Sequence, residues 1–116
     1  MESLKRQEDF KRCYHTGRSK ANRYLVLYAV KREDDPEESL SNSNRIGISV
    51  SKKVGNSVTR HRVKRLIRES CRLHEAAFNS GLDLVIVARI LAAEADFTTI
   101  ESAVLSLAKR LEIMEK

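Results

Sequence analysis

One stretch of this 116-residue chain changes its hydrophobic period halfway, and this change limits the possible folds more than any other feature. In residues 45–51, apolar side chains alternate with small or polar ones, which predicts a strand with one buried face. From about residue 57 to residue 74 the apolar side chains recur at helical spacing instead. Gly55 marks the turn between them, and Asn56 or Ser57 can cap the helix. A strand therefore leads almost directly into a helix.

The remaining elements follow from the same kinds of pattern. Residues 7–16 predict a short first helix, and the aromatic and β-branched run 24–30 predicts a strand. The acidic, Ser- and Asn-rich run 33–44 predicts a mobile surface loop that joins two antiparallel strands. Residues 84–88 predict a strand covered on both faces, and an amphipathic helix starts at about residue 98. We expect an α+β fold, with one sheet packed against helices and no second domain or internal repeat.

Charge is concentrated in the same region of the chain. Between residues 45 and 74 nine Lys and Arg residues face one acid, Glu69, which gives this segment a charge of +8. The whole chain carries +6, so the remaining residues sum to −2. The nine cations are Arg45, Lys52, Lys53, Arg60, Arg62, Lys64, Arg65, Arg68 and Arg72. A polyanion is therefore the expected partner, and nucleic acid is favoured over a membrane surface.

The predicted helix of residues 57–74 has one dry face and one cationic face. The dry side consists of Val63, Leu66, Ile67, Ser70 and His74. The opposite side consists of His61, Arg65, Arg68 and Arg72, flanked by Arg62 and Lys64. A solvated charged face normally mixes signs, whereas here Glu69 is the lone acid, and arginine suits bidentate phosphate contacts. Lys52 and Lys53 precede the helix start, where free backbone N–H groups also favour phosphate.

Other features point to a cytosolic protein without a disulfide framework. No apolar stretch approaches the ~18 residues that span a membrane, and charged residues close to the start exclude a signal-peptide pattern. Cys13 and Cys71 have neither zinc-site spacing nor disulfide density, and we expect both to be small buried or half-buried apolar side chains.

A family resemblance is carried by residues 45–69, with the sequence RIGISVSKKVGNSVTRHRVKRLIRE. This stretch closely resembles the signature of the bacterial ribonuclease P protein subunit. Outside it, the resemblance extends to Asp9-Phe10, Tyr14, Gly17, Ala21-Asn22-Arg23 and Val87-Ala88-Arg89, in the order of the family and over nearly the whole chain. It implies a single RNA-binding domain over residues 1–116, with an αβββαβα order, about four strands in a mixed sheet, three helices and a left-handed βαβ crossover. General rules favour the opposite hand in about 98% of such connections.

The resemblance also implies a function. The family's polypeptide assists a catalytic RNA that hydrolyses precursor tRNA to release the 5′ leader, with Mg²⁺ held mainly by the RNA. The RNA-binding residues then comprise Lys52, Lys53, Asn56, Arg60, His61, Arg62, Lys64, Arg65, Arg68 and Arg72. His61 departs from the asparagine of the family pattern; its ring can still donate a hydrogen bond. We expect no catalytic or metal-binding residue in the chain, no membrane and no obligate protein partner.

A second implied site is a cleft for the single-stranded leader. Phe10, Tyr14 and Tyr28 match its aromatic positions, and stacking of unpaired bases on such rings is physically sensible. Ordinary core packing is the alternative, because Phe10 and Tyr14 have the i, i+4 spacing of any core helix. Arg89 belongs to the same edge, where Ile90 follows in place of the family's frequent second basic residue.

Two other functions compete with this assignment. A protein-only nuclease needs a general base, a nucleophile or a metal cluster, yet the three histidines are scattered and no carboxylate pair lies in the basic segment. A general or ribosome-associated RNA-binding protein would share the charge and the fold class. It has no reason to carry the long 45–69 signature together with an aromatic first helix.

Overall fold

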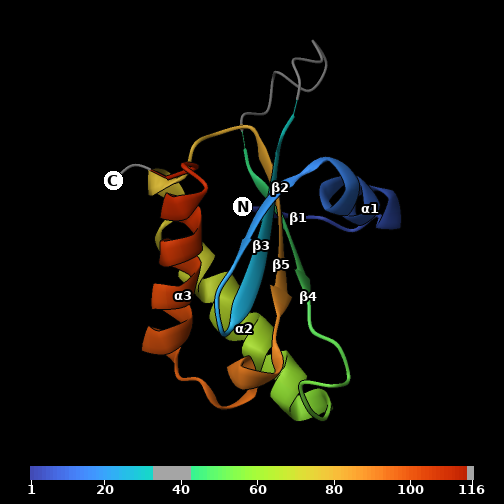
Figure 1. Cartoon of the computed structure of the whole chain (residues 1–116), viewed down its shortest axis with the longest axis vertical. Coiled ribbons are helices and arrows are strands. Elements are labelled where there is room, and N and C mark those ends of the chain that lie inside the picture. The colour runs from blue at the N-terminus through green and yellow to red at the C-terminus, as the bar shows by residue number, and fades with distance from the viewer. Residues whose placement is uncertain (33–42, 115–116) are drawn as a thin grey trace.

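A computed structural model describes residues 1–32 and 43–114 and shows a central sheet between two unequal helical layers. Helices α2 and α3 cover one face of the sheet, and α1 lies alone on the other (Figure 1). The helices are α1 (Gln7–Thr16), α2 (Ser57–Leu73) and α3 (Phe97–Arg110), with two 3₁₀ helices, η1 (Glu75–Ala77) and η2 (Ile90–Glu94). The strands are β1 (Glu2–Ser3), β2 (Arg18–Ala21), β3 (Leu25–Lys31), β4 (Arg45–Ser49) and β5 (Leu82–Ala88). The α+β prediction is confirmed.

The sheet is mixed and has the strand order β1-β4-β5-β3-β2. β4 is parallel to β5 and to β1, while β3 is antiparallel to both β5 and β2. The prediction of about four strands missed β1, whose two residues are too few to produce a sequence pattern. β3 and β4 run in opposite directions, as expected, but β5 lies between them. The loop predicted to join them falls mostly on residues 33–42, outside the described residues.

Most helix and strand boundaries agree with the sequence patterns. α1 has the predicted bounds, and α2 starts after Asn56, whose side chain accepts a hydrogen bond from the Thr59 backbone N–H at 2.9 Å. β4 and β5 are adjacent and parallel and are connected through α2, as the resemblance implies. The left hand of this crossover stays a prediction. Neither 3₁₀ helix was predicted, because three to five residues carry too little periodicity.

The main hydrophobic core lies between the sheet and the pair α2 and α3. The strands contribute alternate residues such as Leu27, Ile46 and Ile86, which are 3% exposed or less. The helices contribute fully buried side chains such as Ile67 and Ile100. Ile46, Ile48 and Val50 all face this core, as the alternation predicted, although Ile48 is only partly buried. The opposite face of the sheet, where α1 lies, is therefore outside the main core.

Both cysteines are free and buried, as expected. Cys71 belongs to the main core, and Cys13 is on the buried side of α1 in the smaller cluster. No helix in the described part of the chain has the length and apolar character needed to cross a bilayer.

Candidate nucleic-acid interface

The two predicted faces of α2 are present. Val63, Ile67, Ser70 and Cys71 are buried against the core. His61, Arg65, Arg68 and Arg72 are all exposed on the opposite side. His61 and Arg65 line a surface hollow of about 480 Å³ together with Ser57, Val58 and Arg62. We name the exposed set His61, Arg65, Arg68 and Arg72 the cationic face of α2.

Two arginines of α2 already have partners within the chain. The guanidinium of Arg62 donates hydrogen bonds to the carbonyl oxygens of Ala93 at 3.1 Å and Ala95 at 2.6 Å. Arg62 therefore attaches α2 to η2, a role that a charge pattern cannot reveal. Arg72 pairs with Glu69 one turn earlier, and its Nε lies 3.0 Å from Oε2 of that carboxylate. Both members of this pair are exposed, so it holds the helix only weakly.

The predicted phosphate-binding turn before α2 lies next to Arg89, which was predicted to contact the leader. Lys52 and Lys53 are exposed, whereas the Asn56 side chain is occupied as the helix cap. Lys53 and Arg89, which the sequence assigned to different sites, line one pocket of about 340 Å³. Ile90 and Leu91 extend its wall and are 63% and 57% exposed. Arg89 also donates to the carbonyl oxygen of Asn22 at 2.9 Å, which fixes it beside the β2–β3 turn.

The three predicted aromatic residues lie together on the α1 side of the sheet. Tyr14 is 40% exposed, and its ring meets that of Tyr28 edge to face, with centroids 5.0 Å apart and planes at 80°. Burial raises the pKa of the Tyr14 hydroxyl, while a side-chain hydrogen bond with Ser49 acts in the opposite direction. Phe10 is only partly buried. We call Phe10, Tyr14, Tyr28 and Ser49 the aromatic cleft.

Two residues of this region were not predicted as functional. Gly47 lies directly beneath Phe10, so a Cβ built there would stand 2.7 Å from Cε1 of the ring. Ser49 follows on the same face of β4 and lies beside Tyr14. The available signal was the alternation itself, which assigned both to the small, polar face of the strand.

The remaining predicted positions are less exposed. Arg60 and Lys64 are partly buried at the borders of the cationic face. In the described ranges, no group of three or more His, Cys, Asp or Glu side chains could hold a metal ion. The geometry thus offers cations for phosphate and rings for bases.

Comparison with known proteins gives one consistent result. The family model of Ribonuclease P matches residues 1–112. The ribonuclease P protein component of Lachnoclostridium phytofermentans is 51% identical over 113 residues, which cover 97% of this chain and 91% of that protein. The solved RNase P protein of Staphylococcus aureus has a TM-score of 0.85 at 31% identity, covering 99% of both chains. An S. aureus mutant described as defective in mRNA degradation has a TM-score of 0.84 at 32% identity and covers 97% of this chain and 89% of its own. The chain therefore belongs to the ribonuclease P protein family.

Proposed function

We propose that this chain is the protein component of a ribonuclease P ribonucleoprotein and promotes removal of the 5′ leader from precursor tRNA. It binds the catalytic RNA through the cationic face of α2 and the leader in the aromatic cleft. The observation that carries the proposal is the division of α2 into a buried side and an exposed side with His61, Arg65, Arg68 and Arg72. Family membership supports the ribonuclease P RNA as a partner, and we assign that RNA to this surface.

The chemistry of the reaction belongs to the RNA in this proposal. Mg²⁺ activates water and stabilises phosphate charge during such hydrolysis, and we assign it mainly to the RNA subunit. The chain contributes affinity and position: arginine forks on phosphates and rings beside unpaired bases. We propose that the whole chain, 1–116, acts as one RNA-binding domain in the cytoplasm.

Reconstitution tests the proposal as a whole. Precursor tRNA is incubated at low Mg²⁺ with the protein alone, with a bacterial ribonuclease P RNA alone, and with both. We expect cleavage at the mature 5′ end to require the mixture. Cleavage by the protein alone would overturn the division of labour, and an mRNA substrate in that arm tests for the activity named for the S. aureus protein. RNA binding without promotion of cleavage would instead indicate a general RNA-binding protein.

The cationic face is tested by salt dependence. Arg65→Ala and Arg68→Ala should each weaken binding of the RNA subunit and reduce the slope of log affinity against log salt by roughly 0.7 to 0.9. Lys109→Ala removes an equal charge from an exposed position on α3 and should leave the slope nearly unchanged. Equal slopes for all four proteins would contradict this assignment.

The aromatic cleft is tested by comparing precursor and mature tRNA. Tyr14→Ala should reduce the preference of the holoenzyme for the precursor, since stacking is worth about 1–3 kcal/mol per base. Tyr14→Phe keeps the ring and loses only the hydroxyl, so it should retain most of the preference. Equal losses of precursor and mature tRNA binding in Tyr14→Ala would favour simple core packing.

A further inference from the structure

α1 is held to the sheet by few apolar contacts. The buried members of the cluster on this face are Leu4, Cys13 and Val85, with Phe10, Tyr28, Val30 and Val87 only partly buried around them. Such a cluster excludes water from a small area and leaves the direction of the helix weakly determined. Directional polar contacts must therefore contribute to the placement of α1.

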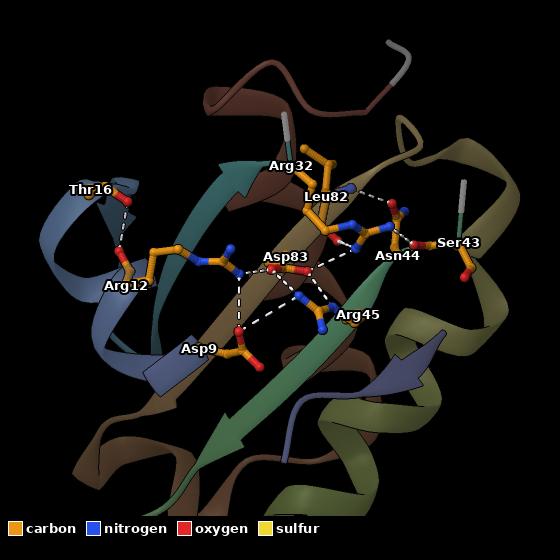
Figure 2. Close-up of polar contacts among 9 residues, drawn as sticks. All are labelled: Asp9, Arg12, Thr16, Arg32, Ser43, Asn44, Arg45, Leu82 and Asp83. Atoms are coloured by element: carbon orange, nitrogen blue, oxygen red, sulfur yellow. Dashed lines mark hydrogen bonds and ion pairs between the residues drawn. The ribbon is translucent and has the colours of Figure 1, made fainter. Parts of the chain in front are cut away.

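Those contacts converge on a buried carboxylate. Asp83, near the start of the central strand β5, is completely inaccessible to solvent and points toward the α1 face (Figure 2). Arg45 of β4 binds both of its oxygens, with Nε to Oδ1 at 2.8 Å and Nη2 to Oδ2 at 2.7 Å. Arg32, just after β3, donates to Oδ1 at 2.9 Å. Asp83 thus ties together three strands of the sheet.

A third arginine extends the network to α1. Arg12 of α1 donates to Oδ2 of Asp83 and also to Asp9 of its own helix at 3.4 Å. Asp9 in turn lies 3.8 Å from Nη2 of Arg45. Figure 2 shows Asp9 and Arg12 approaching the sheet network from the same helix. We call Asp83 with Arg12, Arg32 and Arg45 the Asp83 network.

Electrostatic interactions hold the side chains of the Asp83 network in one arrangement. A buried carboxylate without partners is strongly unfavourable, so Asp83 stays charged only while the guanidinium groups surround it. Burial alone would raise the pKa of Asp83, yet hydrogen bonds from Arg45 and Arg32, with the charges of Arg45 and Arg12, hold it below its ordinary value. Paired bonds from a planar guanidinium also fix direction, which apolar contacts do not.

α1 meets one face of β4 at three successive positions. Asp9 approaches Arg45, Phe10 covers Gly47, and Tyr14 lies beside Ser49. These β4 residues lie two apart and therefore point to the same side of the sheet. The Asp83 network holds one end of this series, and the aromatic cleft forms the other. A displacement at the first end changes the position of Tyr14 relative to Tyr28 and Ser49.

We propose that Asp83, acting through Arg12, is a positioning residue that sets α1 over the sheet and thereby sets the geometry of the aromatic cleft. This inference rests on the proposed function of the cleft as the leader site. It assigns a part in precursor recognition to a residue that no RNA can reach.

Charge and position make opposite predictions for Asp83→Asn, and salt separates them for Arg12→Gln. Asp83→Asn removes a negative charge and Arg12→Gln removes a positive one, so a purely electrostatic attraction of the leader would strengthen in the first and weaken in the second. Positioning predicts that both weaken the preference for the precursor. Lys11→Gln is the matched control, because it removes an equal charge from an exposed position of the same helix, outside the Asp83 network.

The experiment measures precursor and mature tRNA affinities of holoenzymes reconstituted with these variants, at low and raised salt. We expect Asp83→Asn and Arg12→Gln to lower the precursor-to-mature ratio by about three- to thirtyfold at both salt concentrations. Lys11→Gln should keep a ratio close to that of the wild type. Affinity for the RNA subunit should change little in any variant, because the cationic face belongs to α2 on the other side of the sheet.

Each result has a defined meaning. A wild-type ratio of one, or a Tyr14→Ala variant with an unchanged ratio, would overturn the proposed leader site and this inference with it. If Tyr14→Ala lowers the ratio while Arg12→Gln does not, only the positioning role is overturned. A gain in Asp83→Asn, or an Arg12→Gln loss that disappears at raised salt, would also overturn it. Should Asp83→Asn fail to fold, the comparison of Arg12→Gln with Lys11→Gln at the two salt concentrations decides.

Discussion

The two faces of the central sheet are built by different kinds of interaction. On the α2 and α3 side, interlocking aliphatic side chains from the three central strands and two helices form the main core. On the α1 side, a few apolar residues and a buried ionic network hold a single short helix. The first arrangement supplies most of the stability, since apolar burial is roughly proportional to area. The second supplies direction, which a recognition cleft needs more than it needs stability.

The largest expected effect is a loss of stability caused by a substitution in the main core, on the α2 and α3 side of the sheet. Ile100 of α3 is completely buried in the main core, so Ile100→Ala should lower the free energy of unfolding by about 2–5 kcal/mol. Urea unfolding measures this loss. Below the unfolding transition, the ratio of precursor to mature tRNA affinity should stay at the wild-type value. A lower ratio in the folded variant would show that the two faces are not independent.

A matched pair of valines sharpens this comparison. Val104 of α3 and Val85 of β5 are both at most 1% exposed, but they face opposite sides of the sheet. Their alanine variants should lose similar stability, about 1–3 kcal/mol. Only Val85→Ala should also lower the precursor preference.

Adding a methyl group on the α1 side of the sheet should lower stability less than Ile100→Ala does. It should lower the preference for the precursor more. A Cβ at position 47 would stand within 3 Å of the Phe10 ring, so Gly47→Ala must displace that ring and with it α1. We expect a loss of about 1–3 kcal/mol in urea unfolding, together with loss of most of the precursor preference. An unchanged preference would show that Phe10 does not report the position of α1.

Gly81→Ala is the control for this variant. Gly81 has a φ of +76°, which strains any residue with a Cβ, and apart from its chain neighbours no atom of the described residues lies within 4 Å of the position that a Cβ would take. The substitution should therefore cost about 1–2 kcal/mol through the backbone alone. The precursor preference should not change.

The sequence predicts the two faces unequally well. Helical and alternating periods locate α2, β4 and the core between them, because both signals are local and extend over many residues. Asp83 has no such signal: it lies in an apolar run, and its partner Arg12 is 71 positions away. Likewise, the charge pattern assigns Arg62 to RNA, but cannot show that two backbone carbonyls accept its hydrogen bonds. What a side chain binds at long range depends on the fold, which local patterns do not contain.

Low pH should have a smaller effect on stability, through the buried carboxylate on the α1 side of the sheet. The pKa of Asp83 is lower in the folded chain than its ordinary value of about 3.9, so its stabilising contribution is complete above that value and is lost as the pH falls through the folded pKa. The stability difference between wild type and Asp83→Asn should therefore be constant above about pH 5 and shrink below about pH 4. Urea unfolding across this range measures it. A difference that grows on acidification would contradict the ionic account of this face.

The smallest expected effect is local opening without unfolding, and the two cysteines report it. Cys13 is on the buried side of α1, and Cys71 is in the main core. Both are at most 1% exposed. Burial raises the pKa of both thiols, that of Cys71 to about 12, so neither reacts at neutral pH until the chain opens around it. Because α1 is held by fewer apolar contacts, Cys13 in a Cys71→Ala chain should react with a thiol reagent faster than Cys71 in a Cys13→Ala chain. Asp83→Asn should accelerate Cys13 further and leave Cys71 nearly unchanged below the unfolding transition. Equal rates for the two thiols would mean that α1 detaches only when the whole chain unfolds, and the two faces would then form one cooperative unit.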